Sequence, residues 1–359
     1  MSRTTPRGRV RIIDVGRAFP PHYYDQQTLA DAFAAQWPDA PHRQRRVAQF
    51  HEAVGVGGRH LALPLERYLN LDDFGAANDA WIEVGLQVGE AALRDAMARA
   101  RVDWARVGAI FSVSVTGVAT PSLEARLMNR VPALPRHLKR VPIFGLGCVA
   151  GAAGLARAAD YVRAFPDEIA LVLSVELCSL TLQRQDPSVA NLISAGLFGD
   201  GAACAVVAGA YVPAEGPVVV ATRSVFFDDT ERVMGWDISG DGFRVVLDKS
   251  VPDVVRARLR PAVDAFLADH GRALADLGSF VCHPGGPKVI EAMETALDAP
   301  PEALELARRS LAEVGNLSSA SVLMVLRDTL ERRRPAPGTL GLLAALGPGF
   351  CAELVLLRW

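Results

Sequence analysis

The sequence lacks long hydrophobic runs. None of its 359 residues belong to an uncharged apolar stretch of about 18 residues, the length a helix needs to cross a bilayer. The N-terminus, MSRTTPRGRVRIIDVG, is basic, but the apolar run after it is short and alternating, as in a strand rather than a signal peptide. The sequence therefore predicts a cytoplasmic protein without membrane insertion.

An excess of charge of one sign is also missing. The chain has 38 Lys and Arg against 40 Asp and Glu, a net charge of -2. No global field therefore favours nucleic acid as a partner, and an anionic ligand must be met by a local basic cluster. The densest cluster, PHRQRR, contains Arg46, and Arg59 and Lys288 are further candidates.

Paired cysteines are absent as well. The five cysteines form no CxxC pair, which disfavours a zinc site and a disulfide framework. We therefore expect no metal and look for a nucleophile among them. They are Cys148, Cys178, Cys204, Cys282 and Cys351.

What the chain does have is a composition with 50% hydrophobic residues, arranged as alternating strands and helices. Residues 1–212 contain four short β-branched runs with a small-residue helix between two of them, and residues 213–359 repeat the plan. The boundary is placed near GAYVPAEGP, where Gly and Pro interrupt the pattern. Two α/β halves of similar content predict two mixed sheets between helices. The runs are RVRIIDVG, VGAIFSVSVTG, EIALVLSVEL and GAACAVVAG, then PVVVATRSVFF, LGSFVC and GLLAALGPGFCAELVLLRW.

The stretch FGLGCVAGAAG, which contains Cys148, has two incompatible interpretations. Its glycines fit a loose dinucleotide fingerprint, but such a motif belongs in the first βα turn rather than in the middle of the chain. A thiol at the sharp start of a helix, surrounded by small residues, instead fits a nucleophile elbow. An inert core cysteine is the third possibility.

Two residues of the second half favour the nucleophile. His283 follows a hydrophobic strand in FVCHPGGP, and Asn316 precedes an apolar helix in EVGNLSSAS. A lone histidine is usually structural and such an asparagine is ordinarily an N-cap. Together with Cys148, however, they stand at the ends of three different helices and strands, and two packed halves could bring these ends to one point.

Such a trio supports a specific chemistry. A thiolate beside an imidazolium, at the positive end of a helix dipole, attacks a thioester and forms an acyl-enzyme. The His283 and Asn316 N–H groups would then stabilise the enolate oxygen formed when a malonyl group loses carbon dioxide. This chemistry requires no metal and no redox cofactor.

Six ordered motifs carry a family resemblance: GLGCVAGAAGLARAADYV, GLFGDGAAC, GDGFRVVLDKSVP, CHPGGP, EVGNLSSAS and LGPGFCAE. Over nearly its whole length the chain resembles the type III polyketide synthases, the chalcone-synthase-like branch of the thiolase-fold superfamily. The resemblance implies an α/β, thiolase-like fold whose two pseudo-repeated halves form a five-layer αβαβα sandwich. It also implies acyl-CoA and malonyl-CoA as substrates, and a homodimer in which the loop tip, Thr120, enters the partner's cavity.

The resemblance assigns site residues by motif. Cys148, His283 and Asn316 take the places of the catalytic triad, and Phe198 and Phe243 those of two gatekeeping phenylalanines. A glycine-rich loop shapes the family's cavity, although Leu346 here replaces its aromatic residue. The further substrate-binding candidates are Val115, Thr120, Thr181, Ser318, Gly347, Pro348 and Gly349.

The starter is inferred only by likeness. Family members that use malonyl-CoA as starter and build a naphthalene carry cysteines where this chain has Val115 and Thr181, which argues against that product. The alanine-rich helix after Cys148 resembles instead the branch that makes alkylpyrones or alkylresorcinols from fatty acyl starters. Three alternatives stay open. They are an initiating ketoacyl synthase that uses acyl-carrier protein, a plant-like synthase with aromatic starters, and a non-catalytic acyl-binding protein.

Overall fold

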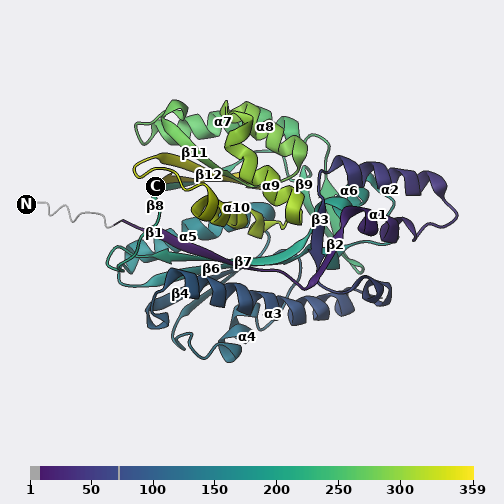
Figure 1. Ribbon diagram of the computed structural model, residues 1–359, viewed down its shortest axis with the longest axis horizontal. Coiled ribbons are helices and arrows are strands. Elements are labelled where there is room, and N and C mark those ends of the chain that lie inside the picture. The colour runs from purple at the N-terminus through teal and green to yellow at the C-terminus, as the bar shows by residue number, and fades with distance from the viewer. Residues whose placement is uncertain (1–8, 72) are drawn as a thin grey trace, which may run out of the picture.

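A nine-stranded sheet organises the molecule. The computed structural model describes residues 9–71 and 73–359, so the basic segment 1–8 lies outside the described residues. The strand order is β11-β12-β13-β8-β1-β7-β6-β4-β5 (Figure 1). The strands are β1 (Arg11–Ala18), β4 (Val107–Val113), β5 (Lys139–Ile143), β6 (Ile169–Leu177), β7 (Asp200–Ala208), β8 (Val218–Phe226), β11 (Leu277–Cys282), β12 (Leu340–Gly347) and β13 (Cys351–Arg358).

The strand order contains an internal repeat. In β4-β6-β7-β1 the first two strands are parallel and the next two pairings are antiparallel, and β11-β12-β13-β8 has the same pattern. One residue pair, Arg11 with Val218, joins β1 to β8 and makes a single sheet of the two halves. The predicted boundary at 212/213 falls between β7 and β8, and it remains a prediction because one hydrophobic cluster contains residues of both halves.

Helices complete five layers. In the middle layer, α5 (Ala150–Ala164) packs against α10 (Ser319–Arg332), while α3 (Phe74–Ala100) covers β1 and β7 (Figure 1). On the other outer face, α7 (Val251–Ala268) and α8 (Pro287–Leu297) pack together beside β11. A Cβ at Gly151 would lie 2.2 Å from the Ser319 carbonyl oxygen, so the small residues of α5 permit this close approach. The predicted αβαβα sandwich is confirmed.

Several elements lie outside the repeat. Helices α1 (Gln26–Ala34), α2 (Pro41–Ala53) and α6 (Val189–Leu197) pack together at the right of Figure 1. The remaining elements are α4 (Leu123–Arg130), α9 (Glu305–Val314), the hairpin strands β2 (His22–Asp25) and β3 (Gly58–Leu61), and the hairpin strands β9 (Met234–Ser239) and β10 (Gly242–Leu247).

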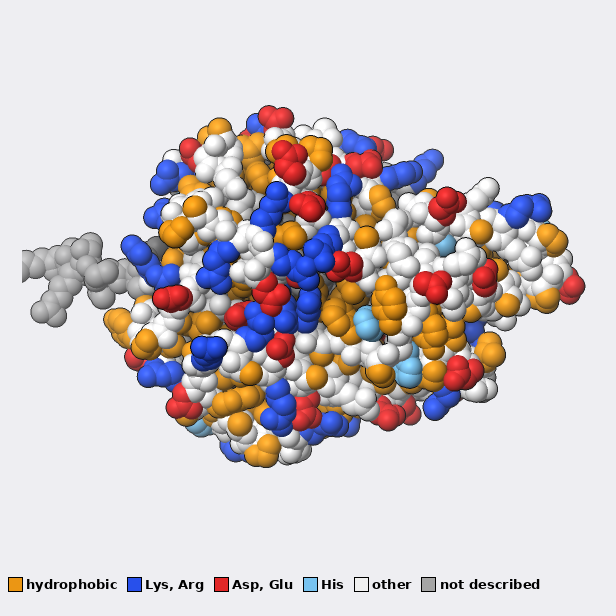
Figure 2. Space-filling model, viewed as in Figure 1, with side chains coloured by type: hydrophobic (Ala, Val, Ile, Leu, Met, Phe, Trp, Pro, Cys, Tyr) orange, Lys and Arg blue, Asp and Glu red, His pale blue; other side chains and the backbone are white. Residues whose placement is uncertain are grey.

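The face where α3, β1 and α10 meet carries arginines interleaved with carboxylates (Figure 2). Arg99 pairs with Glu331 at 2.8 Å, and Arg327 pairs with Asp95 at 2.5 Å. Because α3 belongs to the first half and α10 to the second, these ion pairs connect the halves. Across the described ranges, no helix combines the length and the apolarity that crossing a membrane would require.

Candidate active site

Cys148 lies in a 3-10 turn, Gly147–Val149, immediately before α5. The turn needs glycine at position 147, where φ is +57° and a Cβ would lie 2.6 Å from Cδ of Pro348. The Cys148 thiol is 5% exposed and donates to Oγ of Ser318 at 3.6 Å. The predicted nucleophile therefore sits at a helix start, under the C-terminal glycine-rich loop.

Asn316 is not the N-cap of α10, because that position belongs to Ser318. The Asn316 backbone pairs with the segment that follows α6, since its N–H donates to the Leu197 carbonyl at 2.9 Å. Its Oδ1 accepts from the Ser318 N–H at 2.8 Å, and its Nδ2 donates to the Gly285 carbonyl at 3.2 Å. An amide nitrogen carries two N–H groups, so the second is left for a ligand. Ser318 adopts a strained φ of +48°, the backbone conformation in which its N–H bonds the Asn316 side chain.

His283 follows β11 and is 2% exposed. Its backbone N–H donates to the Ala344 carbonyl at 2.9 Å, while neither ring nitrogen has a hydrogen-bond partner among the described residues. Hydrogen bonds lead from Cys148 to Ser318, on to Asn316, and through the Gly285 backbone to the backbone carbonyl of His283. The structure thus links the three predicted residues by one continuous chain of contacts.

Burial makes both reactive groups neutral. Desolvation raises the pKa of Cys148 to about 12 and lowers the pKa of His283 to about 3, because each charged form loses its hydration. The Cys148 thiol bonds Ser318 rather than the imidazole. The contact between thiol and imidazole that the sequence led us to expect is therefore not made among the described residues.

A cavity of about 40 Å³ adjoins Cys148; we call it the nucleophile cavity. Apart from Cys148 itself, four of the predicted site residues line it, and the β9–β10 hairpin supplies a wall that includes Trp236. Gly347 lies behind it, where a Cβ would be 2.7 Å from the Val149 nitrogen. The four residues are Val115, Phe198, Ser318 and Pro348.

The other cavity candidates lie further out. Phe243 is 3% exposed and packs edge-on against Phe74, with ring centroids 5.2 Å apart. Thr181 donates to the Cys178 carbonyl at 2.8 Å and, like Phe243, lines a neighbouring cavity. Gly349 adopts φ +142° in the C-terminal loop, and Thr120 is exposed.

The three basic candidates have different positions. Arg46 is exposed on α2, with its guanidinium over the Phe50 ring, and Lys288 is exposed in the first turn of α8. Arg59, however, is 3% exposed and donates to the Phe198 carbonyl at 3.1 Å. It is buried near Asp200 rather than facing solvent, so we withdraw it as a CoA-phosphate contact.

Glu176, which is fully buried in β6, is not among the site residues expected from the sequence. Its Oε2 accepts from the Val115 N–H at 3.2 Å and from the Thr116 hydroxyl at 2.9 Å, and its Oε1 accepts from Ser319. Burial raises the pKa of Glu176 to about 7. The available signal was a single acid within the strand sequence IALVLSVEL. Glu176 connects the end of β4 to the start of α10.

The fold and this site define a thiolase-like condensing enzyme. Within residues 9–71 and 73–359, no cluster of three or more His, Cys, Asp or Glu side chains could hold a metal ion. The N-terminal domain of the chalcone and stilbene synthases matches residues 1–211, and their C-terminal domain matches residues 218–359. The chain therefore belongs to the chalcone and stilbene synthase family. It is a type III polyketide synthase, an acyltransferase.

Relatives of known name align over most of the chain. The sequence is 51% identical to a 1,3,6,8-tetrahydroxynaphthalene synthase of Streptomyces peucetius subsp. caesius, over 97% of this chain and 93% of that protein. It is 37% identical to a putative chalcone synthase of Bacillus subtilis (strain 168), over 97% and 98%. The crystal structure of the tetrahydroxynaphthalene synthase of Streptomyces coelicolor A3(2) superposes with a TM-score of 0.92 at 32% identity, over 97% of this chain and 99% of that one.

Proposed function

We propose that Cys148 accepts an acyl group from a CoA thioester. The observation that carries this proposal is the chain of contacts that joins Cys148, Asn316 and His283 across the two halves. The Cys148 sulfur attacks the thioester carbonyl while its proton passes to the free imidazole nitrogen of His283. That proton then leaves with the departing CoA thiol. A neutral imidazole, which the buried His283 supplies, is the form able to accept it.

The same side chains would also carry out extension of the acyl chain. The malonyl-CoA thioester oxygen accepts hydrogen bonds from an N–H of His283 and the second N–H of Asn316. Carbon dioxide departs, and the electron pair of the broken C–C bond becomes an enolate. The enolate carbon attacks the acyl group on Cys148, the C–S bond breaks, and the sulfur recovers a proton. The product is a β-ketoacyl-CoA longer by one two-carbon unit, ready to reload.

The proposed starter is malonyl-CoA itself, with a polyhydroxylated aromatic product. The 51% identical relative is named for a tetrahydroxynaphthalene, and a 33% identical relative from Pseudomonas fluorescens is a phloroglucinol synthase. The nucleophile cavity is also small, at about 40 Å³. Both observations support a compact starter and cyclisation to an aromatic ring.

The second candidate is the fatty acyl starter expected from the sequence, with a pyrone or resorcinol product. Two observations favour it. Val115 and Thr181 stand where the naphthalene-forming relatives are expected to carry cysteines, and the cavities next to Cys148 have largely apolar walls. Malonyl-CoA offered alone and then with octanoyl-CoA, followed by mass spectrometry, distinguishes the candidates. Aromatic products from malonyl-CoA alone support the first, and products only with octanoyl-CoA support the second.

The catalytic roles are tested by separating the half-reactions. Cys148→Ala should form no acyl-enzyme. Asn316→Ala should still be acylated but lose malonyl-CoA decarboxylation by on the order of 10²-fold, the effect of removing one oxyanion donor. His283→Ala should impair both steps. Acylation is measured by intact-protein mass spectrometry and decarboxylation by release of labelled carbon dioxide. Equal loss of both half-reactions in Asn316→Ala would refute its role.

A further inference from the structure

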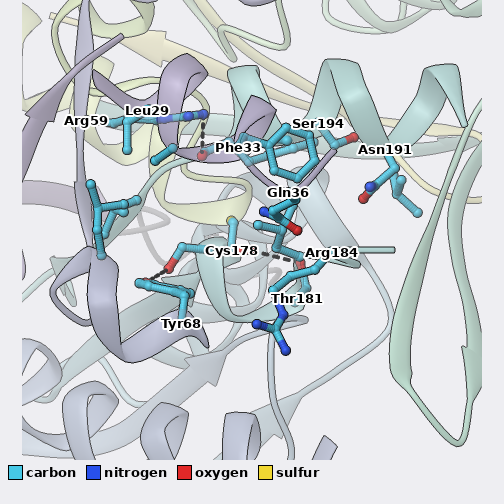
Figure 3. A pocket seen from close by; sticks show the side chains of 18 of the residues that line it. Leu29, Phe33, Gln36, Arg59, Tyr68, Cys178, Thr181, Arg184, Asn191 and Ser194 are labelled. Atoms are coloured by element: carbon cyan, nitrogen blue, oxygen red, sulfur yellow. Dashed lines mark hydrogen bonds between the residues drawn. The ribbon is translucent and has the colours of Figure 1, made fainter. Parts of the chain in front are cut away.

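The cavity around Phe33 and Cys178 (Figure 3) adjoins the nucleophile cavity and belongs to the active site. A larger groove of about 970 Å³ lies where β1, β8 and the end of α5 come together. We call it the β8 groove. Figure 1 shows β8 and the start of β1 at the left, far from α1 and α2. Cys148 stands just before α5 and the groove is lined by residues 162–164 at the other end of this 15-residue helix, so the two lie about 20 Å apart.

One edge of β8 is almost unpaired. Along its other edge β8 pairs with β13 from Val218 to Phe226. On the groove side, β1 pairs with β8 only through Arg11 and Val218, and the Val219 N–H donates to the Val10 carbonyl at 2.9 Å. Because β1 runs antiparallel to β8 and leaves it from this point, no strand of the described residues lies beside residues 220–226 on this edge.

The backbone groups of the free edge follow from the alternation of a strand. The Phe227 N–H donates to the Phe350 carbonyl at 3.0 Å, on the β13 side. Successive residues direct their N–H and C=O groups to opposite edges, so Thr222, Ser224 and Phe226 direct theirs away from β13. Ser224 and Phe226 are also exposed, Phe226 at 63%. Such a row of open donors and acceptors can pair with a further strand.

The rim of the β8 groove is cationic. Arg9, Arg163 and Arg358 line it. Arg163 pairs with Asp160 at 2.9 Å, whereas Arg9 and Arg358 form no ion pair within the part of the chain that the structure describes. Among the described residues, no carboxylate lines the groove. The charge of the rim therefore favours an acidic ligand.

We propose that the β8 groove binds an acidic, extended segment of a partner protein, which adds to the free edge of β8 as a strand. Main-chain hydrogen bonds to β8 hold the segment, and its carboxylates meet Arg9 and Arg358. Its apolar side chains contact Tyr211 and Val220, which line the groove and are 61% and 37% exposed.

Two features separate this site from other occupants and from the chemistry. The residues before Arg9 include Arg3 and Arg7 and no acid, so the charge of the chain's own first segment does not complement the groove. The distance of about 20 Å to Cys148, set by the length of α5, leaves the nucleophile accessible while the groove is filled. A partner protein held there would remain beside the synthase during catalysis.

The experiment uses the full chain and a fluorescein-labelled heptapeptide of alternating glutamate and valine. One control peptide has lysine in place of glutamate, and another is the acidic peptide with every backbone nitrogen methylated, so that it has no N–H to donate. Fluorescence anisotropy should show binding of the acidic peptide and at least about tenfold weaker binding of both controls. Hydrogen exchange of residues 220–226 should slow when the acidic peptide binds, and malonyl-CoA decarboxylation should not change.

Charge reversal identifies the site. Arg9→Glu and Arg358→Glu should each weaken binding of the acidic peptide by about fivefold at low salt, the effect of one exposed charge pair. Both arginines are exposed, so neither change disturbs the core. Arg45→Glu is the matched control, because Arg45 is equally exposed but lies on α2, outside the groove.

Four results would overturn the proposal. They are no binding of the acidic peptide at about 1 mM, equal binding of either control peptide, slow exchange of Thr222 and Ser224 in the free monomer, and self-association that Arg358→Glu abolishes. The third result would show that the chain itself covers the edge, and the fourth would assign the groove to a second copy. A protein that binds the peptide but does not decarboxylate malonyl-CoA would contradict the proposed function alone.

Discussion

The thiol of Cys148 carries the reaction and yet is neutral at rest. Because burial raises its pKa to about 12, the thiolate fraction at neutral pH is small. We expect alkylation of Cys148 by iodoacetamide to accelerate by about tenfold per pH unit between pH 7 and pH 9. A preformed ion pair would instead react at a rate independent of pH across this range.

The matched control for this prediction is His283→Ala. If His283 is neutral at rest, its removal leaves the alkylation rate nearly unchanged, while it abolishes acylation by CoA thioesters. The labelled residue must be identified by peptide mass spectrometry, because a second thiol, Cys178, lines the same cavity. A pH-independent rate that falls on removal of His283 would show that a thiolate–imidazolium pair exists after all.

Single residues also show what a sequence does and does not reveal. Cys148, His283 and Asn316 can be proposed from the sequence because each stands in a motif at an element end, and their catalytic roles remain predictions. Arg59 was misassigned, since a sequence records its charge but not its burial beside Asp200. Glu176 was missed because its partners come from segments far from it in the sequence, such as Ser319.

At the scale of elements, the ends of α2 and α6 meet the start of α8. The end of α2 reaches α8, since a Cβ at Gly55 would lie 3.4 Å from Pro287, and the end of α6 lies close by, with Leu197 3.8 Å from a Cβ at Gly286. Arg46 on α2 and Lys288 on α8 are exposed on the elements that flank this junction. We propose that they contact the CoA phosphates.

Charge reversal tests that assignment. Arg46→Glu and Lys288→Glu should each raise the Michaelis constant for malonyl-CoA by about fivefold at low salt, because an exposed charge pair contributes up to about 1 kcal/mol. The effect should weaken as salt screens the charges. Arg45→Glu, also on exposed α2, is the control for net charge. The Michaelis constant is measured by steady-state kinetics at two ionic strengths. If neither charge reversal changes it, these two residues do not contact CoA.

The elements differ in how well the sequence predicts them. Strands β4, β6, β7 and β12 are buried at every residue, so their continuous apolar runs can be recognised in the sequence. The hairpin β9–β10 is only partly buried and carries no such run. Helix α2 buries only Val47 and His51, which is too narrow a stripe to recognise.

At the scale of the whole molecule, one edge of the sheet is left uncovered. Strand β5 pairs only with β4, and the segments that follow the two strands run together, because the Ser114 N–H donates to the Ile143 carbonyl. Three large apolar side chains are exposed there, Val118 at 42%, Val141 at 38% and Phe144 at 49%. Contiguous exposed apolar groups mark an interaction surface. We propose that a second copy of the chain covers them in a symmetric homodimer.

The loop tip links this interface to the proposed activity. Thr120 is exposed next to the apolar surface, and the family resemblance predicts that it enters the partner's cavity. A bulky side chain there should narrow the space for long acyl groups, so Thr120→Trp should reduce use of octanoyl-CoA by about tenfold, consistent with an overpacking cost of 1–3 kcal/mol. Use of acetyl-CoA should persist, since a short chain does not reach the tip.

Phe144→Asp serves as the companion variant, because a charge in the apolar surface should dissociate the dimer. Light scattering that shows a fully active monomer would exclude the dimer, and an unchanged starter profile in Thr120→Trp would place this loop outside the cavity wall.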